Sequence, residues 1–144
     1  MKFYTLLILT ITLTFSSCTV EPQPIDYGND HCHFCDMTVV DKTHSAEYTT
    51  KKGKSYMFDA VECLVRKVNR DGNENELAFI LVADYANPGK LTKAKEATYL
   101  ISKKIKSPMG ANLSAFESKE NALKTQSEFG GEVFTWLEIK NKFQ

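Results

Sequence analysis

The apolar and polar positions along the chain predict a strand, strand, helix, strand order that occurs twice. In the first unit, segments 45–50 and 55–58 flank a Lys-Lys-Gly-Lys turn, which is typical of a β-hairpin. Asp59 is placed to cap a following helix, with Glu62 as its capping-box partner. The apolar run 77–83 then predicts a buried strand. Four apolar residues mark the buried face of the helix: Val61, Leu64, Val65 and Val68.

The second unit shows the same order with a weaker pattern. Segments 97–102 and 113–116 predict two strands, and Ser118 is expected to cap a helix that runs to Phe129. Segment 133–137, which holds the only Trp, predicts a last strand. The helix residues expected to face the interior are Ala122, Leu123 and Phe129. The chain is therefore expected to adopt an α+β fold of two small, packed ββαβ units.

The N-terminus has the pattern of an export signal. Lys2 precedes an apolar, Thr-containing run that is too short to span a bilayer but long enough for the core of a signal peptide. Cys18 follows two Ser, as at a bacterial lipoprotein cleavage site, although Phe15 stands where Leu is usual. We expect residues 1–17 to be a lipoprotein signal peptide and Cys18 to be lipidated. An ordinary secretory signal is the alternative.

The remaining chain divides into a tether and a folded domain. Residues 18–30 contain two Pro and a Gly and show no hydrophobic period, so they are expected to form a lipid-anchored tether. The folded domain is expected at 31–144, with units of about 31–86 and 87–144, within the size range of one domain. Several acyl chains would hold such a protein firmly at a membrane. The expected location is the periplasmic side of the cell envelope.

The net charge points to no particular class of partner. The chain has 18 basic and 18 acidic side chains, so its formal net charge is zero. Such a balance gives no hint of nucleic acid or of an acidic substrate. No nucleic-acid partner is expected.

One short stretch gathers ligands for a soft metal. Residues 31–37 read His-Cys-His-Phe-Cys-Asp-Met, and they contain two of the three His in the chain. Thiolate and thioether together favour Cu(I). A further Met lies in a Pro-Met-Gly loop at 108–110, which is expected to approach the motif. The site would then be split between a mobile N-terminal segment and a loop of the folded body. The candidate ligands are Cys32, Cys35, Met37, Met109, His31 and His33.

A Cys-x-x-Cys pair has other uses. Haem attachment needs His directly after the second Cys, and Asp36 stands there, so this use is excluded. A thioredoxin-like pair should begin a helix after a strand, whereas Cys32 and Cys35 follow a flexible segment. A structural zinc site needs four ligands, and no second Cys pair follows. A thiol–disulfide oxidoreductase, a zinc-stapled structural lipoprotein and a plain structural disulfide remain alternatives.

The count of thiols favours a metal. Lipidation of Cys18 would leave Cys32, Cys35 and Cys63, and an odd number cannot all pair within the chain. In an oxidising compartment, a bound metal is one reason for thiols to stay free. Cys63 itself lies beside the apolar face of the first helix and is expected to belong to the core. His44 has no partner in sequence and is expected at the surface.

The chain resembles the NosL family of copper-binding lipoproteins, which are accessory proteins of nitrous-oxide reductase. Two departures are visible, because Asp36 stands where the family usually has Gly and segment 87–93 lacks a Trp. The segments that carry the resemblance are Cys18 after a signal, Cys32-x-x-Cys35-x-Met37, Tyr56-Met57-Phe58-Asp59 with Cys63, Ala83-Asp84-Tyr85, and Pro108-Met109-Gly110 followed by Ala115-Phe116.

The resemblance implies a function without catalysis. It implies two ββαβ units related to the organomercury-lyase fold, and Cu(I) bound by the Cys pair with Met37 and Met109. It implies delivery of copper at the membrane surface for assembly of the copper–sulfide centre of nitrous-oxide reductase. The implied partners are an ABC-type transporter complex and, through it, the reductase.

Overall fold

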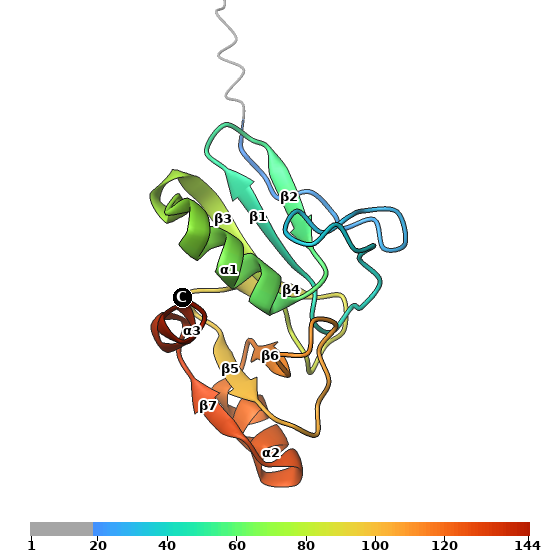
Figure 1. Cartoon of the computed structure of the whole chain (residues 1–144), viewed down its shortest axis with the longest axis vertical. Coiled ribbons are helices and arrows are strands. Elements are labelled where there is room, and N and C mark those ends of the chain that lie inside the picture. The colour runs from blue at the N-terminus through green and yellow to red at the C-terminus, as the bar shows by residue number, and fades with distance from the viewer. Residues whose placement is uncertain (1–18) are drawn as a thin grey trace, which may run out of the picture.

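A computed structural model describes residues 19–144 of the chain (Figure 1). The signal peptide expected at 1–17 and the lipidation expected at Cys18 lie outside these residues. Among the residues described, no helix is both long and apolar enough to cross a membrane.

The first unit is a four-stranded antiparallel sheet with one helix on its face (Figure 1). Its strand order is β2-β1-β3-β4, so the predicted hairpin and buried strand are confirmed. In the centre of the sheet, Tyr48 lies opposite Tyr56 on one side and Ile80 on the other. The elements are β1 (Ala46–Thr50), β2 (Ser55–Phe58), α1 (Val61–Asp71), the 3-10 turn Glu74–Glu76, β3 (Leu77–Ala83) and β4 (Leu91–Lys93).

The second unit repeats this order with a smaller sheet. Its strands lie in the order β6-β5-β7, and all pairs are antiparallel. Two units of the ββαβ order are therefore present, as expected for this α+β fold. The elements are β5 (Thr98–Ile101), β6 (Leu113–Phe116), α2 (Lys119–Phe129), β7 (Glu132–Phe134) and α3 (Trp136–Lys142).

The helix starts agree with the sequence in one unit and not in the other. The Ser118 side chain caps α2 by accepting a hydrogen bond from the backbone N–H of Asn121, as predicted. The N-cap of α1 is Ala60, and no side chain caps that helix, so the capping box predicted for Asp59 and Glu62 is wrong. Both carboxylates are buried and turn to other partners.

The C-terminal region differs from the prediction because of a cap. The last strand ends at Phe134, and Trp136 begins α3 instead of extending the strand. Thr135 and Glu138 form a capping box, which stops the extended chain and starts the helix. On α2, only Ala122 is buried, whereas Leu123 and Phe129 are 45% and 38% exposed, so their predicted burial is wrong.

The two units share one hydrophobic core. Trp136 and Ile139 of α3 belong to the same buried cluster as Leu64 of α1 and Tyr99 of β5. The backbone N–H of Tyr85, just after β3, donates to the carbonyl of Ala115 in β6 at 2.8 Å. The units are thus joined both by side-chain packing and by the backbone.

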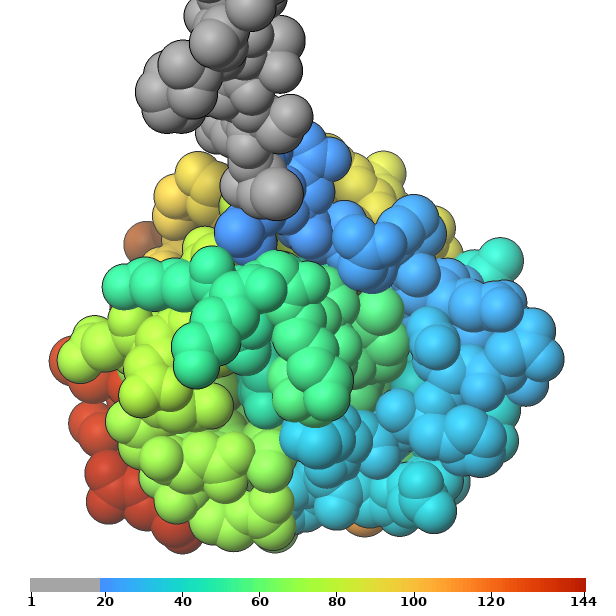
Figure 2. Space-filling view, turned by 90° about the horizontal axis from the view of Figure 1, so that it is seen from above, coloured from blue at the N-terminus to red at the C-terminus, as the bar shows by residue number. Residues whose placement is uncertain are grey.

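The segment expected to be a tether lies against the first unit from Gln23 onward. The Gln23 N–H donates to Glu47 Oε1 at 2.9 Å, and the Tyr27 hydroxyl lies 2.9 Å from Ser45 Oγ. The Val39 N–H donates to the carbonyl of Asp30 at 2.8 Å. Figure 2 shows this blue segment lying across the surface. These contacts hold the segment that leads into the sulfur motif.

Candidate metal centre

The sulfur motif forms a tight loop beside β2. The Cys32 N–H donates to the carbonyl of Met37 at 2.8 Å, and the Asp36 N–H donates to the carbonyl of Cys32 at 2.9 Å. Asp36 has a φ of +65°, a left-handed conformation that favours Gly and that Asp tolerates better than most residues. The His33 N–H donates to the carbonyl of Met57 at 2.8 Å, which ties the loop to β2. The loop is therefore packed against β2 and is not the mobile N-terminal segment that the sequence predicted.

Four side chains converge where this loop meets the start of α1. The Sγ atoms of Cys32, Cys35 and Cys63 and a carboxylate oxygen of Asp59 all lie within 4.8 Å of one another. We call these four residues the thiol cluster. Asp59 follows the last residue of β2, and Cys63 lies in the first turn of α1. All three cysteines are free thiols.

Three residues of the thiol cluster are buried, and the fourth is partly exposed. Cys32, Cys63 and Asp59 are at most 2% exposed, whereas Cys35 is half-buried. The Cys35 thiol donates to Asp59 Oδ1 at 3.4 Å, and its sulfur lies 4.0 Å from that of Cys63. Asp59 Oδ2 has no hydrogen-bond partner among residues 19–144. A buried, unpaired carboxylate oxygen is unfavourable, and a cation among the sulfur atoms would pair it.

The three thiols have different acidities. The neighbouring Cys63 thiol stabilises the Cys32 thiolate and outweighs burial, which lowers the pKa of Cys32 to about 6. Burial raises the pKa of Cys35 to about 11. The pKa of Cys63 is also raised, because its thiol hydrogen-bonds to Cys32 and is buried. Because a metal binds the thiolate form of cysteine, metal binding at this cluster would release protons.

The predicted thioether ligands lie at the surface. Met37 is 48% exposed and Met109 is 42% exposed, so neither fills the core. The loop of Met109 is tied to α1, because buried Glu62 accepts hydrogen bonds from Ser107 Oγ and from the backbone N–H of Ala111. Their role as metal ligands stays a prediction.

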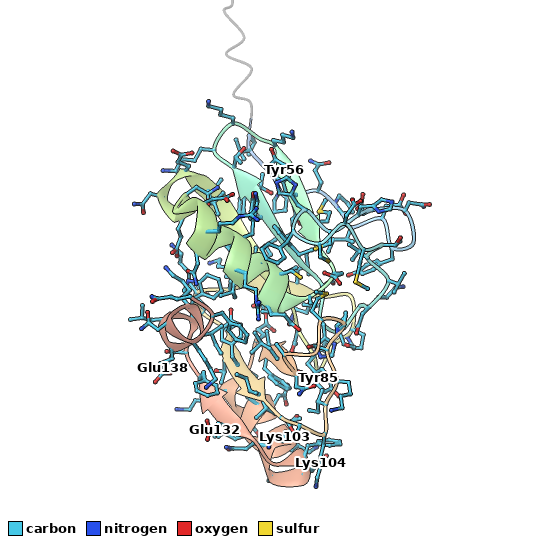
Figure 3. All side chains as sticks on the ribbon, in the orientation of Figure 1. Tyr56, Tyr85, Lys103, Lys104, Glu132 and Glu138 are labelled. Carbon is cyan, nitrogen blue, oxygen red and sulfur yellow. The ribbon has the colours of Figure 1, made fainter. Side chains whose placement is uncertain are left out.

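The two candidate imidazoles are also exposed. His31 Nδ1 lies 3.1 Å from the carbonyl oxygen of Asp36 and so supports the loop. The ring of His33 lies against that of Tyr56, which is labelled in Figure 3, with 4.1 Å between ring centroids. Partial burial and the charge of Lys67 lower the pKa of His33. Ligation by either His stays a prediction.

Two members of the thiol cluster were not among the ligands that the sequence suggested. Cys63 lies in the core, as expected, and its sulfur also faces Cys35. Asp59 was expected at a helix cap, yet its carboxylate accepts from the Cys35 thiol. The odd thiol count was the available signal for Cys63. His44, expected at the surface, is 2% exposed, with Nδ1 2.9 Å from Asp41 Oδ2 and Nε2 3.1 Å from Ser114 Oγ. It links the two units instead.

Comparison with known proteins places these features in a family. No curated protein matches the chain significantly. The crystal structure of the copper chaperone NosL from Shewanella denitrificans superposes with a TM-score of 0.72 at 20% identity, covering 83% of this chain and 96% of that chain. At this identity the likeness shows a common fold. The family model NosL matches residues 24–143, which contain both ββαβ units and the thiol cluster. The chain belongs to the NosL family.

Proposed function

We propose that this protein binds Cu(I) at the thiol cluster and delivers it to a partner. One observation carries the proposal: three free thiols and a buried carboxylate lie within 4.8 Å of one another in a member of the NosL family. Three sulfur ligands match the preference of Cu(I) for soft donors and for low coordination numbers. The fold shared with a copper chaperone supports this function.

The arrangement suits a metal that must be released. Cys32 and Cys63 are buried and hold their sulfur atoms in place, whereas half-buried Cys35 is open to exchange. Exposed Met37 lies two residues beyond Cys35, and Met109 lies on a loop tied to the helix turn of Cys63. We propose that these thioethers bind copper as it enters or leaves, with assistance from His31 or His33.

Membership of the family supports a specific client. We propose that the copper is delivered for assembly of the copper–sulfide centre of nitrous-oxide reductase, through an ABC-type transporter complex. The protein would work on the periplasmic side of the envelope, anchored by a lipid on Cys18. Its own role is to carry copper rather than to catalyse a reaction.

The test is a Cu(I) titration against a chromogenic chelator without oxygen. We expect the double variant Cys32→Ser with Cys35→Ser to lose more affinity than the roughly 10- to 100-fold that removal of an outer-shell partner costs. A matched control is Ala115→Ser with Ala122→Ser, two buried positions outside the thiol cluster. Unchanged affinity in the cysteine variant would overturn the proposal.

Zinc is a second candidate, because three thiols and one carboxylate supply the four ligands of a structural zinc site. Metal analysis of protein purified without added metal, followed by competition between Zn²⁺ and Cu(I), separates the two. Retention of zinc against an excess of Cu(I) would favour a structural staple.

A redox role is the third candidate. The pKa of Cys32 is about 6, and the Cys35 and Cys63 sulfur atoms are 4.0 Å apart, which favours thiol–disulfide exchange. An oxidoreductase would show a reversible couple near the potential of its compartment and little effect of Met37→Leu. A chaperone would lose copper affinity in that variant.

A further inference from the structure

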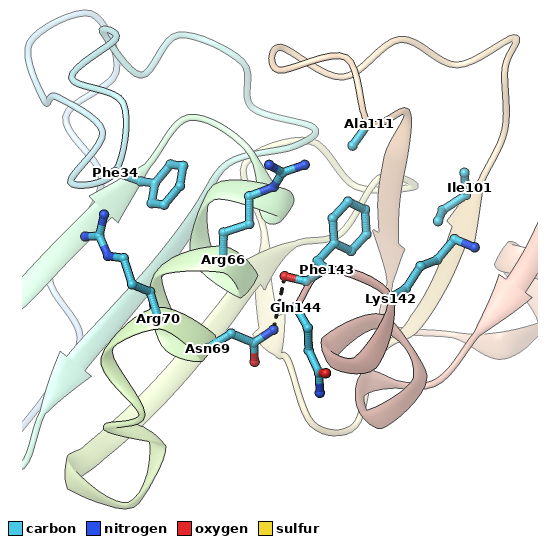
Figure 4. Close-up of a pocket in the computed structure, with 9 residues that line it drawn as sticks. All are labelled: Phe34, Arg66, Asn69, Arg70, Ile101, Ala111, Lys142, Phe143 and Gln144. Carbon is cyan, nitrogen blue, oxygen red and sulfur yellow. Dashed lines mark hydrogen bonds between the residues drawn. The ribbon is translucent and has the colours of Figure 1, made fainter.

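A pocket of about 840 Å³ opens at the junction of the two units (Figure 4). One wall comes from α1 and the other from the end of α3. Asn69 of α1 fixes this junction, because its side-chain amide donates to the carbonyls of Lys140 and Phe143 at 2.8 and 3.3 Å. The pocket is therefore a built part of the fold. Apolar atoms of its lining belong to Phe34, Ile101, Ala111 and Phe143.

The charged side chains that line the pocket are all cationic. They are Arg66, Arg70 and Lys142, and no acidic side chain from residues 19–144 lines the pocket, although the chain as a whole has a net charge of zero. Among residues 19–144, no carboxylate lies within 4.0 Å of the charged groups of Arg66 and Lys142. Arg70 has only a 3.4 Å contact with its neighbour Asp71. The pocket thus gathers three cationic side chains, of which Arg66 and Lys142 have no ion pair among residues 19–144.

Aromatic rings hold these cations in place. The guanidinium carbon of Arg66 lies 5.5 Å from the ring centroid of Phe143, and that of Arg70 lies 5.3 Å from the ring centroid of Phe34. A ring orients a cation without cancelling its charge. The two guanidinium groups are therefore positioned for an external anion, and each can take a carboxylate in a bidentate contact.

Two lining residues are neighbours of the thiol cluster in sequence. Phe34 lies between Cys32 and Cys35 and forms part of the pocket wall. Arg66 follows Cys63 by less than one turn of α1. The pocket wall therefore includes part of the loop and part of the helix that carry the cysteines.

We propose that this pocket receives an acidic segment, with one or more apolar side chains, of the protein that exchanges copper with the thiol cluster. Carboxylates would meet Arg66, Arg70 and Lys142, and an apolar side chain would cover Phe143 and Ile101. The volume exceeds what a single carboxylate fills and is typical of sites that enclose a larger ligand. The identity of the partner as a copper-exchanging protein rests on the proposed function, whereas binding of an acidic segment does not.

The probe is a fluorescein-labelled peptide of alternating Glu and Leu, with a Lys and Leu peptide of the same length as the charge control. Binding to the metal-free protein is followed by fluorescence anisotropy. We expect the acidic peptide alone to bind, and its affinity to fall as salt rises. Arg66→Glu with Lys142→Glu should weaken binding about tenfold or more. Arg66→Gln with Lys142→Gln should give a smaller loss in the same direction.

The matched control is Lys103→Glu with Lys104→Glu, two exposed lysines in the second unit outside the pocket (Figure 3). It makes the same change in net charge and should keep the affinity for the peptide. The proposal would be overturned if the two charge-reversal variants lost peptide affinity equally. It would also be overturned if the wild-type protein did not bind the acidic peptide, or bound the basic peptide equally well. The proposal would also be overturned if the pocket variant lost its binding to anionic phosphatidylglycerol vesicles but kept its affinity for the peptide.

Copper affinity separates this proposal from the function on which it rests. Both charge reversals should keep wild-type affinity for Cu(I), because neither removes a member of the thiol cluster. If Cys32→Ser with Cys35→Ser keeps its copper affinity while the pocket variant loses the peptide, the copper function fails and the docking site stands. If the cysteine variant loses copper while the pocket variant keeps the peptide, the docking site fails alone.

Discussion

The two ββαβ units have the same order of elements but use their helices in opposite ways. In the first unit, six residues of α1 are buried, among them the charged Glu62 and the thiol Cys63. In the second, α2 buries Ala122 alone and leaves Leu123 and Phe129 partly exposed. One helix therefore belongs to the centre of the molecule and the other covers its outer face (Figure 1).

The difference is clearest at the helix starts. Each helix begins shortly after a strand that ends in a fully buried Phe, Phe58 in one unit and Phe116 in the other. In the second unit Ser118 caps α2, a contact that contributes about 1 kcal/mol in other helices. In the first unit Asp59 faces the thiols, and α1 has no side-chain cap. Asp59 is of a residue type suited to helix capping, but it belongs to the thiol cluster instead. The same order of elements thus carries a candidate metal centre in the first unit.

The largest effect is expected from the third thiol. Cys63→Ser should lower the affinity for Cu(I) by more than about 100-fold, because the loss of a sulfur ligand should exceed the loss of an outer-shell partner. The matched control is Asn121→Ser, in the first turn of α2, which should leave the affinity unchanged. Chelator competition measures both. A wild-type affinity in Cys63→Ser would show that the first helix contributes no ligand.

The next effect concerns the second unit and its link to the first. A Cβ on Gly131 would lie 2.2 Å from the carbonyl oxygen of Ile101, and this Gly has a φ of +110°. Gly131→Ala should lower the free energy of unfolding by about 2 kcal/mol. Gly72→Ala, in open space at a φ of +60°, should cost about 1 kcal/mol.

Urea unfolding measures both variants. Because the units share one core, Gly131→Ala should unfold in a single transition seen by all probes. Two separate transitions would show that the units are independent, and the comparison would then be between two domains.

A smaller effect is expected at the carboxylate of the site. Asp59→Asn keeps the shape of the side chain but removes the charge beside the Cys35 thiol, so the affinity for Cu(I) should fall about tenfold. The control is Glu117→Gln, at the exposed position that also follows the buried Phe of its unit. Titration with Cu(I) at fixed pH measures the affinity of each variant. Equal affinities in the two variants would mean that Asp59 has only a structural role.

The smallest effect is a pH dependence at the junction of the units. Burial opposes the shift, but hydrogen bonds from Lys140, Trp136 and Lys95 lower the pKa of Glu74 from 4.5 to about 2. A carboxylate with a lowered pKa in the folded state stabilises it above its unfolded pKa and loses that contribution as the pH falls. Wild-type stability should therefore decline between about pH 4.5 and 2.

Glu74→Gln removes the titrating group, so the variant should be less stable at neutral pH and should show a flatter decline in that range. Thermal unfolding across the pH range measures it. Parallel curves for the two proteins would show that Glu74 does not link the units electrostatically.

Local patterns predicted most of the elements because hydrophobic period is a local property. The hairpin, α1 and the buried strand β3 lie where the period of apolar residues placed them, and α2 lies where the Ser118 cap placed it. Errors arose where a local signal competed with another local signal or with a tertiary contact. Trp136 continued an apolar strand pattern, but the capping box of Thr135 and Glu138 starts a helix. Asp59 matched a capping pattern, yet its carboxylate accepts from the Cys35 thiol.

The residue pattern along the chain predicts the order of the two units, the sulfur motif at 31–37, and the odd number of thiols that remains if Cys18 is lipidated. Which side chains meet in space depends on the packing of the elements. Packing of α1 against the first sheet brings Cys63 to within 4.0 Å of Cys35, across 28 positions of sequence. Contact of α1 with α3 likewise forms the cationic pocket. Spacing along a chain fixes which side chains share a face, whereas distances between elements depend on how the whole core packs.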